Sequence, residues 1–427
     1  MDLEAPPPTW TADRFGPFVT EDATEFKVAT GAYHRADVFQ AELKKIFYST
    51  WIYLGHESEI AAPGDYKATW IGQQSVILVR DADGVARAFL NICRHRGAGL
   101  CREEQGNTKL FVCPYHGWSY GLDGRLAAIV DRSRFPDDFP TEEKGLIPVA
   151  RVESYGGLIF GSLNAAVESL DSYLGEAKPH IDLWLGRCAG GRYRVAAPHR
   201  YAYRANWKLQ AENVYDGYHA HFVHRSAYNT FQKFDNAFTG RQYTAIRSIG
   251  QTRGFPKGHG VLQAGSPLEN KFVSAEIRQQ YRDELERLNG KARTDEILEN
   301  RHMLIFPSVV IMDNNIRVIQ PRAVNHTEVY SYPMIIEGAH DDINSSRLHD
   351  VQTRVGPAGI IGVDDLEVFH GAQTAMSGPG VESITLSRGL HLEEQTPSGE
   401  RIGAFTDETP QRAFWRRWQA DMGGAQS

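Results

Sequence analysis

The chain has 427 residues, 41% of them hydrophobic and 23% charged, and a formal net charge of -7. This length predicts two or three domains, and the acidic balance excludes the basic surface that binding to nucleic acid or anionic lipid requires. The first residues lack the pattern of a secretory signal, and no run approaches the roughly eighteen apolar residues of a membrane helix. We therefore expect a cytoplasmic protein with neither a nucleic-acid nor a membrane partner.

The first third of the chain predicts one helix followed by short strands. Residues 35–51 have a helical period, with Val38, Leu43 and Ile46 about three to five residues apart. Strand-like runs follow at 75–81, 86–92, 109–113 and 158–164, with a hairpin signal at Asp123-Gly124. Residues 50–165 therefore predict a small antiparallel all-β domain, preceded by a segment, 1–49, that packs on the later domain.

The remaining residues, 166–427, predict an α+β domain. Helix-compatible residues, 203–224, are followed by a polar, Gly-rich stretch without a period, 228–268, which we interpret as a mobile lid. Residues 269–290 form an amphipathic pattern with Gly290 at the position of a C-terminal cap. Three strand-like runs then alternate with turn residues as in an antiparallel meander, at 303–312, 316–322 and 328–336.

Four residues of the first domain have the spacing of metal ligands. Cys93 and His95 form C-x-H, and Cys113 and His116 form C-x2-H. Zinc sites with two Cys and two His usually take both Cys from one loop, whereas here each loop supplies one of each. The pattern instead suits a [2Fe-2S] cluster with two thiolates on one iron and two imidazoles on the other, which raises its reduction potential. Cys101 lies outside the pattern and is interpreted as a buried thiol.

A second group of candidate ligands lies in the later domain. Along a helix, His224 would sit about 140° round from His219, so the two imidazoles can share a metal only if the helix is distorted or ends between them. Two His and one carboxylate would form the facial triad of a non-haem iron oxygenase. The best downstream carboxylates are Asp364 and Asp365, and the residues alone do not choose between them.

These motifs resemble a known family. CRHRG (93–97) and CPYHGWSY (113–120) are similar to the two loops of a Rieske iron-sulfur domain. Together with NWKLQAEN, DGYH and VDDLEVF, they make nearly the whole chain resemble the catalytic α subunits of Rieske ring-hydroxylating oxygenases. With STWIYLGHESEIAAPGDY (49–66), these motifs are similar to the benzoate, toluate and anthranilate branch. Naphthalene-type members place one more residue between the E-N pair and the Asp that follows it.

The resemblance implies a fold and a set of roles. An antiparallel all-β Rieske domain would be joined to a catalytic domain with a helix on an antiparallel sheet, of the helix-grip, START-like type. The iron ligands would be His219, His224 and the second Asp of the pair, Asp365. Asp216 would bridge His219 to the cluster ligand His116 of a neighbouring subunit, which requires a ring of subunits, most simply a trimer. His221 has no matching role and is expected to be structural or to lie behind the ligands.

The implied activity is hydroxylation of a small aromatic acid, such as benzoate, anthranilate or indole-3-acetate. Each chain would hold one [2Fe-2S] cluster and one Fe(II), using O2 and electrons from NADH through a reductase, with or without a ferredoxin. A small β subunit would complete an α3β3 assembly; otherwise an α3 trimer forms. Arg317, Gln320 and Arg322 are candidates for binding the substrate carboxylate, with none assigned. The alternatives are a Rieske monooxygenase or demethylase, a non-enzymatic electron-transfer protein and a zinc scaffold.

Overall fold

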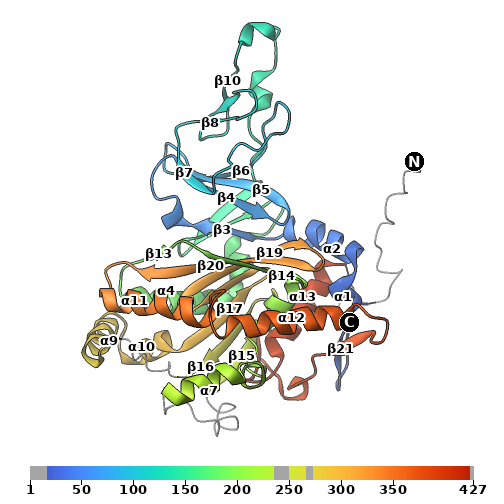
Figure 1. Cartoon of the computed structure of the whole chain (residues 1–427), viewed down its shortest axis with the longest axis vertical. Helices are drawn as coiled ribbons and strands as arrows, with labels where there is room; N and C mark the ends of the chain where they lie inside the picture. Colours follow the sequence, from blue (N-terminus) through green and yellow to red (C-terminus); the bar gives the residue numbers. More distant parts are fainter. Residues whose placement is uncertain (1–16, 235–249, 266–272, 424–427) are drawn as a thin grey trace. The chain divides into compact units, whose positions relative to one another are not determined.

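The computed structural model describes residues 17–234, 250–265 and 273–423. The chain separates into two compact units, one formed by residues 47–173 and the other by 1–46 together with 174–427 (Figure 1). The division predicted from the sequence, at 1–49, 50–165 and 166–427, stays a prediction. Among the described residues, no helix combines the length and the apolar character needed to cross a bilayer.

The smaller unit is built from three antiparallel sheets. The first has the strand order β6-β5-β4-β7, with β4 (Asp65–Ile71), β5 (Gln74–Arg80), β6 (Ala86–Leu90) and β7 (Gln105–Asn107). The second is β10-β9-β8, with β8 (Phe111–Val112), β9 (Ser119–Tyr120) and β10 (Leu126–Ala128). The third is β11-β12-β3, with β3 (Ile52–His56), β11 (Arg151–Tyr155) and β12 (Leu158–Ser162). The predicted strands and the hairpin at Asp123-Gly124 are therefore present.

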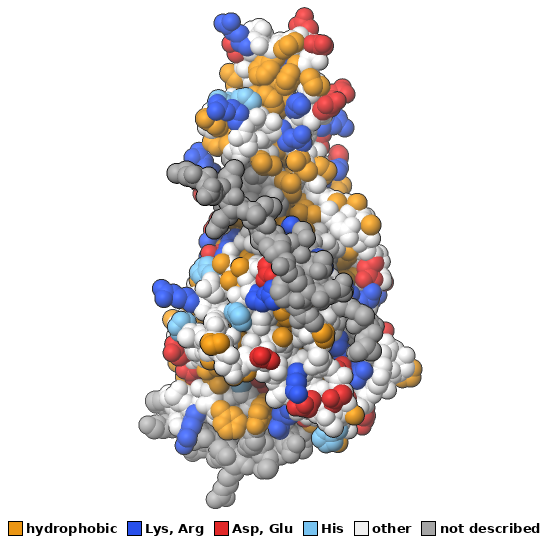
Figure 2. All heavy atoms as spheres, turned by 90° about the vertical axis from the view of Figure 1, so that its right-hand side faces the viewer, with side chains coloured by type: hydrophobic (Ala, Val, Ile, Leu, Met, Phe, Trp, Pro, Cys, Tyr) orange, Lys and Arg blue, Asp and Glu red, His pale blue; other side chains and the backbone are white. Residues whose placement is uncertain are grey.

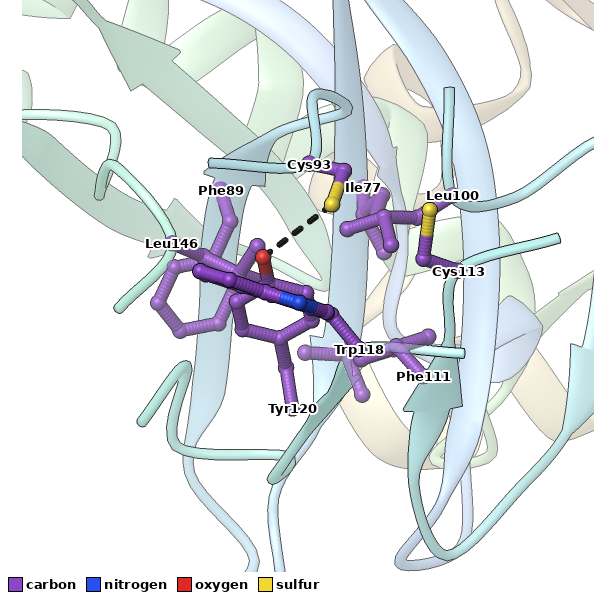
Figure 3. Packing of buried hydrophobic residues seen from close by; sticks show 10 residues of the cluster. Ile77, Phe89, Cys93, Leu100, Phe111, Cys113, Trp118, Tyr120 and Leu146 are labelled. Carbon is purple, nitrogen blue, oxygen red and sulfur yellow. Dashed lines mark hydrogen bonds between the residues drawn. The ribbon is translucent and has the colours of Figure 1, made fainter. Parts of the chain in front are cut away.

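One apolar cluster fills the centre of the smaller unit. Ile77 and Phe89 from the first sheet pack with Phe111 from the second, and Trp118 and Tyr120 join them. Alternate residues of a strand point to one face, so each strand contributes its inward side chains to this cluster. Figure 3 shows that Cys93 and Cys113 enter the same cluster, so both thiols lie in the core.

The larger unit contains a ten-stranded antiparallel sheet. Along one path its order is β13-β20-β19-β18-β17-β16-β15-β23-β22, and β14 also pairs with β20. The strands are β13 (Tyr193–Val195), β14 (His199–Tyr203), β15 (Gly250–Gly254), β16 (Gly260–Ala264), β17 (Asn300–Ile305), β18 (Val309–Met312), β19 (Asn315–Ala323), β20 (His326–Ile336), β22 (Glu394–Gln395) and β23 (Arg401–Ala404). The predicted meander is confirmed by β17 to β20. The predicted irregular lid was wrong over β15 and β16, which pair with each other; residues 235–249 and 266–268 of it lie outside the described residues.

Helices cover this sheet and surround its ends. They are α1 (Gly31–His34), α2 (Ala36–Glu42), α4 (Lys178–Leu185), α5 (Trp207–Asn213), α6 (Ala220–Val223), α7 (Arg225–Phe234), α9 (Ala275–Asn289), α10 (Lys291–Leu298), α11 (Asp341–Asp350), α12 (Gly362–Met376) and α13 (Thr409–Asp421), whereas α3 (Leu170–Leu174) lies at the end of the smaller unit. A small sheet, β1 (Val19–Glu21), β2 (Phe26–Ala29) and β21 (Ser383–Thr385), joins distant parts of the chain. The helix predicted at 35–51 is α2 followed by a π-helical turn, Leu43–Phe47.

Two features of these helices bear on the predictions. In α9 the predicted C-terminal cap is present, since Gly290 has a φ of 76° and its N–H donates to the carbonyl of Glu286. The buried Phe369 of α12 packs against Tyr203 of β14 and Val329 of β20. The larger unit is therefore a helix laid on an antiparallel sheet, which confirms the predicted fold class.

Candidate metal centres

The two Cys-His loops of the smaller unit have the same backbone geometry. In each, the cysteine N–H donates to the carbonyl five residues later at 2.8 Å, and the cysteine carbonyl accepts the glycine N–H four residues later at 3.0 Å. Gly97 and Gly117 have φ values of 76° and 73°, a region that glycine adopts readily and other residues rarely do. The loops therefore present Cys93 and Cys113 in equivalent positions, although the sequence spacing of their histidines differs.

The side chains of these loops converge as a mixed donor set. Both thiols are free and 2% exposed, and the rings of His95 and His116 have centroids 4.7 Å apart. The Nδ1 atoms of both histidines are buried and have no hydrogen-bond partner among the described residues. Buried polar nitrogens are costly without a partner, and a metal ion supplies one. Two sulfurs and two imidazole nitrogens fit the ligand set of a mixed-ligand [2Fe-2S] cluster.

The pKa values of two of these groups favour their metal-binding forms. Burial alone would raise the pKa of Cys113, but the N–H groups of Tyr115 and His116 lower it below its usual value and so favour the thiolate. Burial, with repulsion from His95 and Arg96, lowers the pKa of His116 and favours the neutral imidazole. Thiolate and neutral imidazole are the forms that bind metals.

A tyrosine that the sequence reasoning missed contacts one thiol. The Tyr120 hydroxyl accepts the N–H of Arg94 at 3.0 Å and lies 3.2 Å from Cys93 Sγ, as the dashed line in Figure 3 marks. A cysteine that binds a metal is a thiolate without a proton, so in that form the Tyr120 hydroxyl is the donor to the sulfur. Burial and the neighbouring Cys93 raise the pKa of Tyr120, so the hydroxyl stays protonated. Its only sequence signal was its place two residues after Trp118.

Aromatic and apolar side chains flank the loops. Trp118 is 3% exposed and stacks on His95 with centroids 4.8 Å apart, as expected for a residue that limits water at the cluster. On the outside, Tyr115 between the two ligands of its loop is exposed, and so are Val112 and Val130. Figure 2 shows hydrophobic side chains gathered on the surface of the smaller unit.

In the larger unit the helix pattern of residues 203–224 is broken. Residues up to Tyr203 belong to β14, α5 ends at Asn213, and only the four residues of α6 lie between His219 and His224. The chain is helical from His219 to Val223, and His224, with φ -94° and ψ 26°, lies outside the helix. The two imidazole rings have centroids 5.2 Å apart. The end of α6 at Val223, before the second histidine, is one of the two arrangements expected from the sequence for both rings to reach one metal.

Three side chains converge beyond this break. His219 Nε2 lies 3.5 Å, and His224 Nε2 3.4 Å, from Oδ1 of Asp365, and the potential ligand atoms of all three lie within 4.8 Å of one another. Asp365 is in the first turn of α12 and is 8% exposed. Burial raises its pKa, although both histidines oppose this change. Two imidazoles and one carboxylate on one side of a shared space fit the facial triad of non-haem iron centres.

Each of the two histidines has a second carboxylate behind it. His219 Nδ1 lies 3.3 Å from Asp216 Oδ2, and His224 Nδ1 lies 3.5 Å from Asp364 Oδ2. Carboxylates at this position fix the tautomer and orientation of a ligating imidazole, so that Nε2 faces the metal. Burial opposes protonation of His219, but the hydrogen bond and charge of Asp216 raise its pKa overall. Asp364 thus lies beside Nδ1 of His224, whereas Asp365 belongs to the group of three potential iron ligands.

Asn213 borders the cluster and was missed by the sequence reasoning. Its Nδ2 lies 3.2 Å from His219 Nε2 and 3.3 Å from Asp365 Oδ1. The signal available was its place at the end of the E-N pair that precedes the histidines. His221 is not in the cluster. Burial lowers the pKa of His221.

A buried charge pair holds α5 in place. Asn206 caps the helix by accepting the Lys208 N–H at 3.1 Å, and Lys208 Nζ pairs with Glu42, both side chains being 0% exposed. The indole N–H groups of Trp207 and Trp418 also donate to this carboxylate, at 3.0 and 2.8 Å. The N-W-K motif therefore positions the helix that leads into the metal cluster.

One chain thus combines a domain for a Rieske-type iron-sulfur cluster with a domain for a mononuclear iron. This combination defines the class of Rieske non-haem iron oxygenases. Comparison with protein families matches residues 50–142 to the Rieske [2Fe-2S] domain and residues 191–424 to the catalytic domain of the ring-hydroxylating alpha subunit. This chain belongs to the ring-hydroxylating α subunit family. It carries the family's [2Fe-2S] cluster and mononuclear iron and is an oxidoreductase acting on aromatic substrates.

Several relatives are similar over most of their length. The chain is 32% identical to the 2-halobenzoate 1,2-dioxygenase large subunit of Burkholderia cepacia, covering 85% of this chain and 80% of the relative. It is 33% identical to the toluate 1,2-dioxygenase subunit alpha of Pseudomonas putida, covering 87% and 84%. The large oxygenase component of the naphthalene 1,2-dioxygenase system of Pseudomonas putida is 34% identical, covering 90% and 89%. Identity alone therefore does not separate the two branches.

A solved structure agrees with this fold. Naphthalene 1,2-dioxygenase with indole bound in its active site superposes with a TM-score of 0.85 and 28% identity, covering 95% of this chain and 93% of that one. The similarity extends through both units, so the predicted pairing of a Rieske domain with a catalytic domain is confirmed.

Proposed function

We propose that this chain is the terminal oxygenase component of a dioxygenase that hydroxylates a small aromatic acid. The observation that carries the proposal is the cluster of His219, His224 and Asp365 in a chain that also holds the two Cys-His loops. Three of the similar relatives are named for aromatic acids, 2-halobenzoate, toluate and anthranilate. The indole bound in the similar solved structure supports including indole-3-acetate beside benzoate and anthranilate.

The described residues have the following roles. Cys93, His95, Cys113 and His116 hold the cluster, and His219, His224 and Asp365 hold the iron. When bound, the [2Fe-2S] cluster and the iron would together provide the chemistry that reduces O2. The electrons come from NADH through a reductase, with or without a ferredoxin. Asp216 and Asp364 keep the Nε2 atoms of His219 and His224 turned toward Asp365. Trp118 and the packed core around it exclude water from the Cys-His loops.

Asp216 has a second role as the link to a neighbouring chain. Its Oδ1 accepts the N–H groups of Tyr218 at 2.6 Å and His219 at 3.3 Å, which fixes the carboxylate beside the histidine. Its side chain is 28% exposed, so one edge can also receive an N–H from another molecule. We place His116 of an adjacent copy there, in an α3 ring or, with a small β subunit, in an α3β3 assembly.

The experiment that tests the proposal uses purified oxygenase with its reductase, NADH and ¹⁸O2. Benzoate, anthranilate and indole-3-acetate are supplied separately, and the products are examined by mass spectrometry. A dioxygenase transfers both atoms of one O2 molecule to the same product, whereas a monooxygenase or demethylase transfers one. Labelled product from at least one acid is expected. Absence of oxidised product from iron-loaded protein with every aromatic tested contradicts the proposal.

A further inference from the structure

Arg317 lies on the sheet face that α12 covers. In β19 it stands opposite Val310 of β18 and Ser331 of β20. Because side chains two apart along a strand share a face, Arg317 points to the same side as Val329, whose side chain packs against Phe369 of α12. The helix that carries Asp365 therefore lies over the face to which Arg317 points.

The guanidinium of Arg317 is buried with few partners. Its residue is 6% exposed, its Nη2 donates to the carbonyl of Val355 at 3.3 Å, and its buried Nε has no hydrogen-bond partner among the described residues. In the part of the chain that the structure describes, no carboxylate lies within ion-pair distance of this guanidinium. Buried charges in proteins are normally paired, because leaving one unpaired is strongly unfavourable.

Other arginines of this unit are better satisfied than Arg317. Arg322, five residues later on the same strand, pairs with Glu328 at 2.8 Å. The buried Arg187 pairs with Asp313 at 2.8 Å. The buried Arg347 has no carboxylate partner among the described residues either, but its Nε and Nη2 donate to the carbonyls of Met334 at 3.0 Å and Asp313 at 2.9 Å. Arg317, with one 3.3 Å bond and an unpartnered Nε, is therefore less satisfied than these three.

Arg317 is also within electrostatic reach of the metal cluster. Its positive charge is one of the influences that lower the pKa of Asp365, and it has the same effect on Tyr201, which lies opposite Val329 on the same sheet face. Val355, which accepts from the guanidinium, precedes the short segment that leads into α12. An anion held by Arg317 would thus lie between the sheet and the helix that bears Asp365.

We infer that Arg317 binds the carboxylate of an aromatic acid substrate and so selects acids over neutral aromatic compounds. A planar guanidinium forms paired hydrogen bonds with a carboxylate, and this geometry would complete the partners of Arg317. A neutral ring would leave the buried charge unpaired, so the site discriminates against it. The inference rests on the proposed function, which it extends from the reaction to the substrate class.

The direct test is calorimetric titration of the anaerobic holoenzyme without reductase, so that binding is measured without turnover. The probes are benzoate against benzamide, and indole-3-acetate against indole-3-acetamide. We expect wild-type protein to bind one of the acids about 10- to 100-fold more tightly than its amide, and Arg317→Gln to abolish that preference. Arg317→Lys, which keeps the charge, should restore part of it, and Arg322→Gln should behave as wild type.

Two results would overturn the inference. One is an Arg317→Gln protein that retains its iron and still prefers the acid. The other is a wild-type protein that binds the amides as tightly as the acids, a result that needs no variant to fold. Turnover separates this failure from failure of the proposed function. Oxidation of an acid that binds no more tightly than its amide would leave the proposed function standing and remove the role of Arg317, whereas no oxidation of any aromatic compound removes both.

Discussion

Glu212, at the end of α5 and next to Asn213, is a titrating group on the helix that leads to the metal cluster. Its Oε1 accepts the Tyr33 hydroxyl at 2.6 Å and the Trp415 indole N–H at 2.9 Å. Burial raises the pKa of Glu212 from its ordinary 4.5 to about 7, although these two hydrogen bonds oppose the change. The folded chain therefore holds a neutral carboxyl at mildly acidic pH and a buried charge at alkaline pH.

The effect on stability follows from this pKa. A group whose folded pKa is raised contributes stability that is complete below its unfolded pKa and is lost as pH rises through the folded pKa. For Glu212 this window runs from 4.5 to about 7. One pKa unit corresponds to about 1.36 kcal/mol, so the free energy of unfolding should fall by about 2.5 kcal/mol between pH 5 and pH 8. Glu212→Gln removes the titration and can still accept both hydrogen bonds through its amide oxygen.

The assay is urea unfolding of wild type and Glu212→Gln at pH 5 and pH 8, followed by tryptophan fluorescence, since Trp415 contacts the substituted group. The free energy of unfolding of the variant, relative to that of wild type, should be about 2.5 kcal/mol higher at pH 8 than at pH 5. Glu276→Gln, on the exposed surface of α9, is the matched control and should show no such gain. If the free energy of unfolding changes by the same amount between pH 5 and pH 8 in wild type and Glu212→Gln, Glu212 does not titrate as described.

Three further substitutions have defined outcomes. Tyr120→Phe removes the donor to Cys93 and should lower the cluster potential by about 60 mV in a redox titration, the equivalent of a tenfold change for one electron; an unchanged potential would contradict that bond. Lys208→Met leaves Glu42 buried and unpaired and should destabilise the chain by about 3–5 kcal/mol in denaturant unfolding, with partial recovery on adding Glu42→Leu. Asp216→Asn should keep both metals yet slow turnover at least tenfold, and normal turnover excludes the bridge.

Features encoded locally were predictable from the sequence. The Cys-His loops depend on short spacings and on Gly97 and Gly117, whose positive φ values allow the tight turns. The strands β17 to β20 follow from alternation of apolar residues and turn signals. These patterns carry their information within a few neighbouring residues, so a single sequence is sufficient to predict them.

Features set by packing do not follow from residue spacing, and only the family resemblance favoured Asp365 over Asp364. Asp364 and Asp365 are neighbours with the same chemistry, and only the seating of α12 on the sheet turns Asp365 toward Nε2 of His219 and Asp364 toward Nδ1 of His224. The break in residues 203–224 likewise depends on tertiary contacts that override helix propensity. The unpaired state of Arg317 depends on which distant side chains fail to reach it, and no spacing in the sequence encodes that.

Iron and acid-labile sulfide analysis of anaerobically purified wild type and two site variants decides whether the chain holds two separate metal centres. Wild type should contain about three irons and two sulfides per chain, one cluster plus one iron. Cys113→Ser should retain about one iron and no sulfide, and His219→Ala should retain about two irons and two sulfides. Zinc in place of iron, or loss of the same metal from both variants, would contradict the assignment of two separate centres.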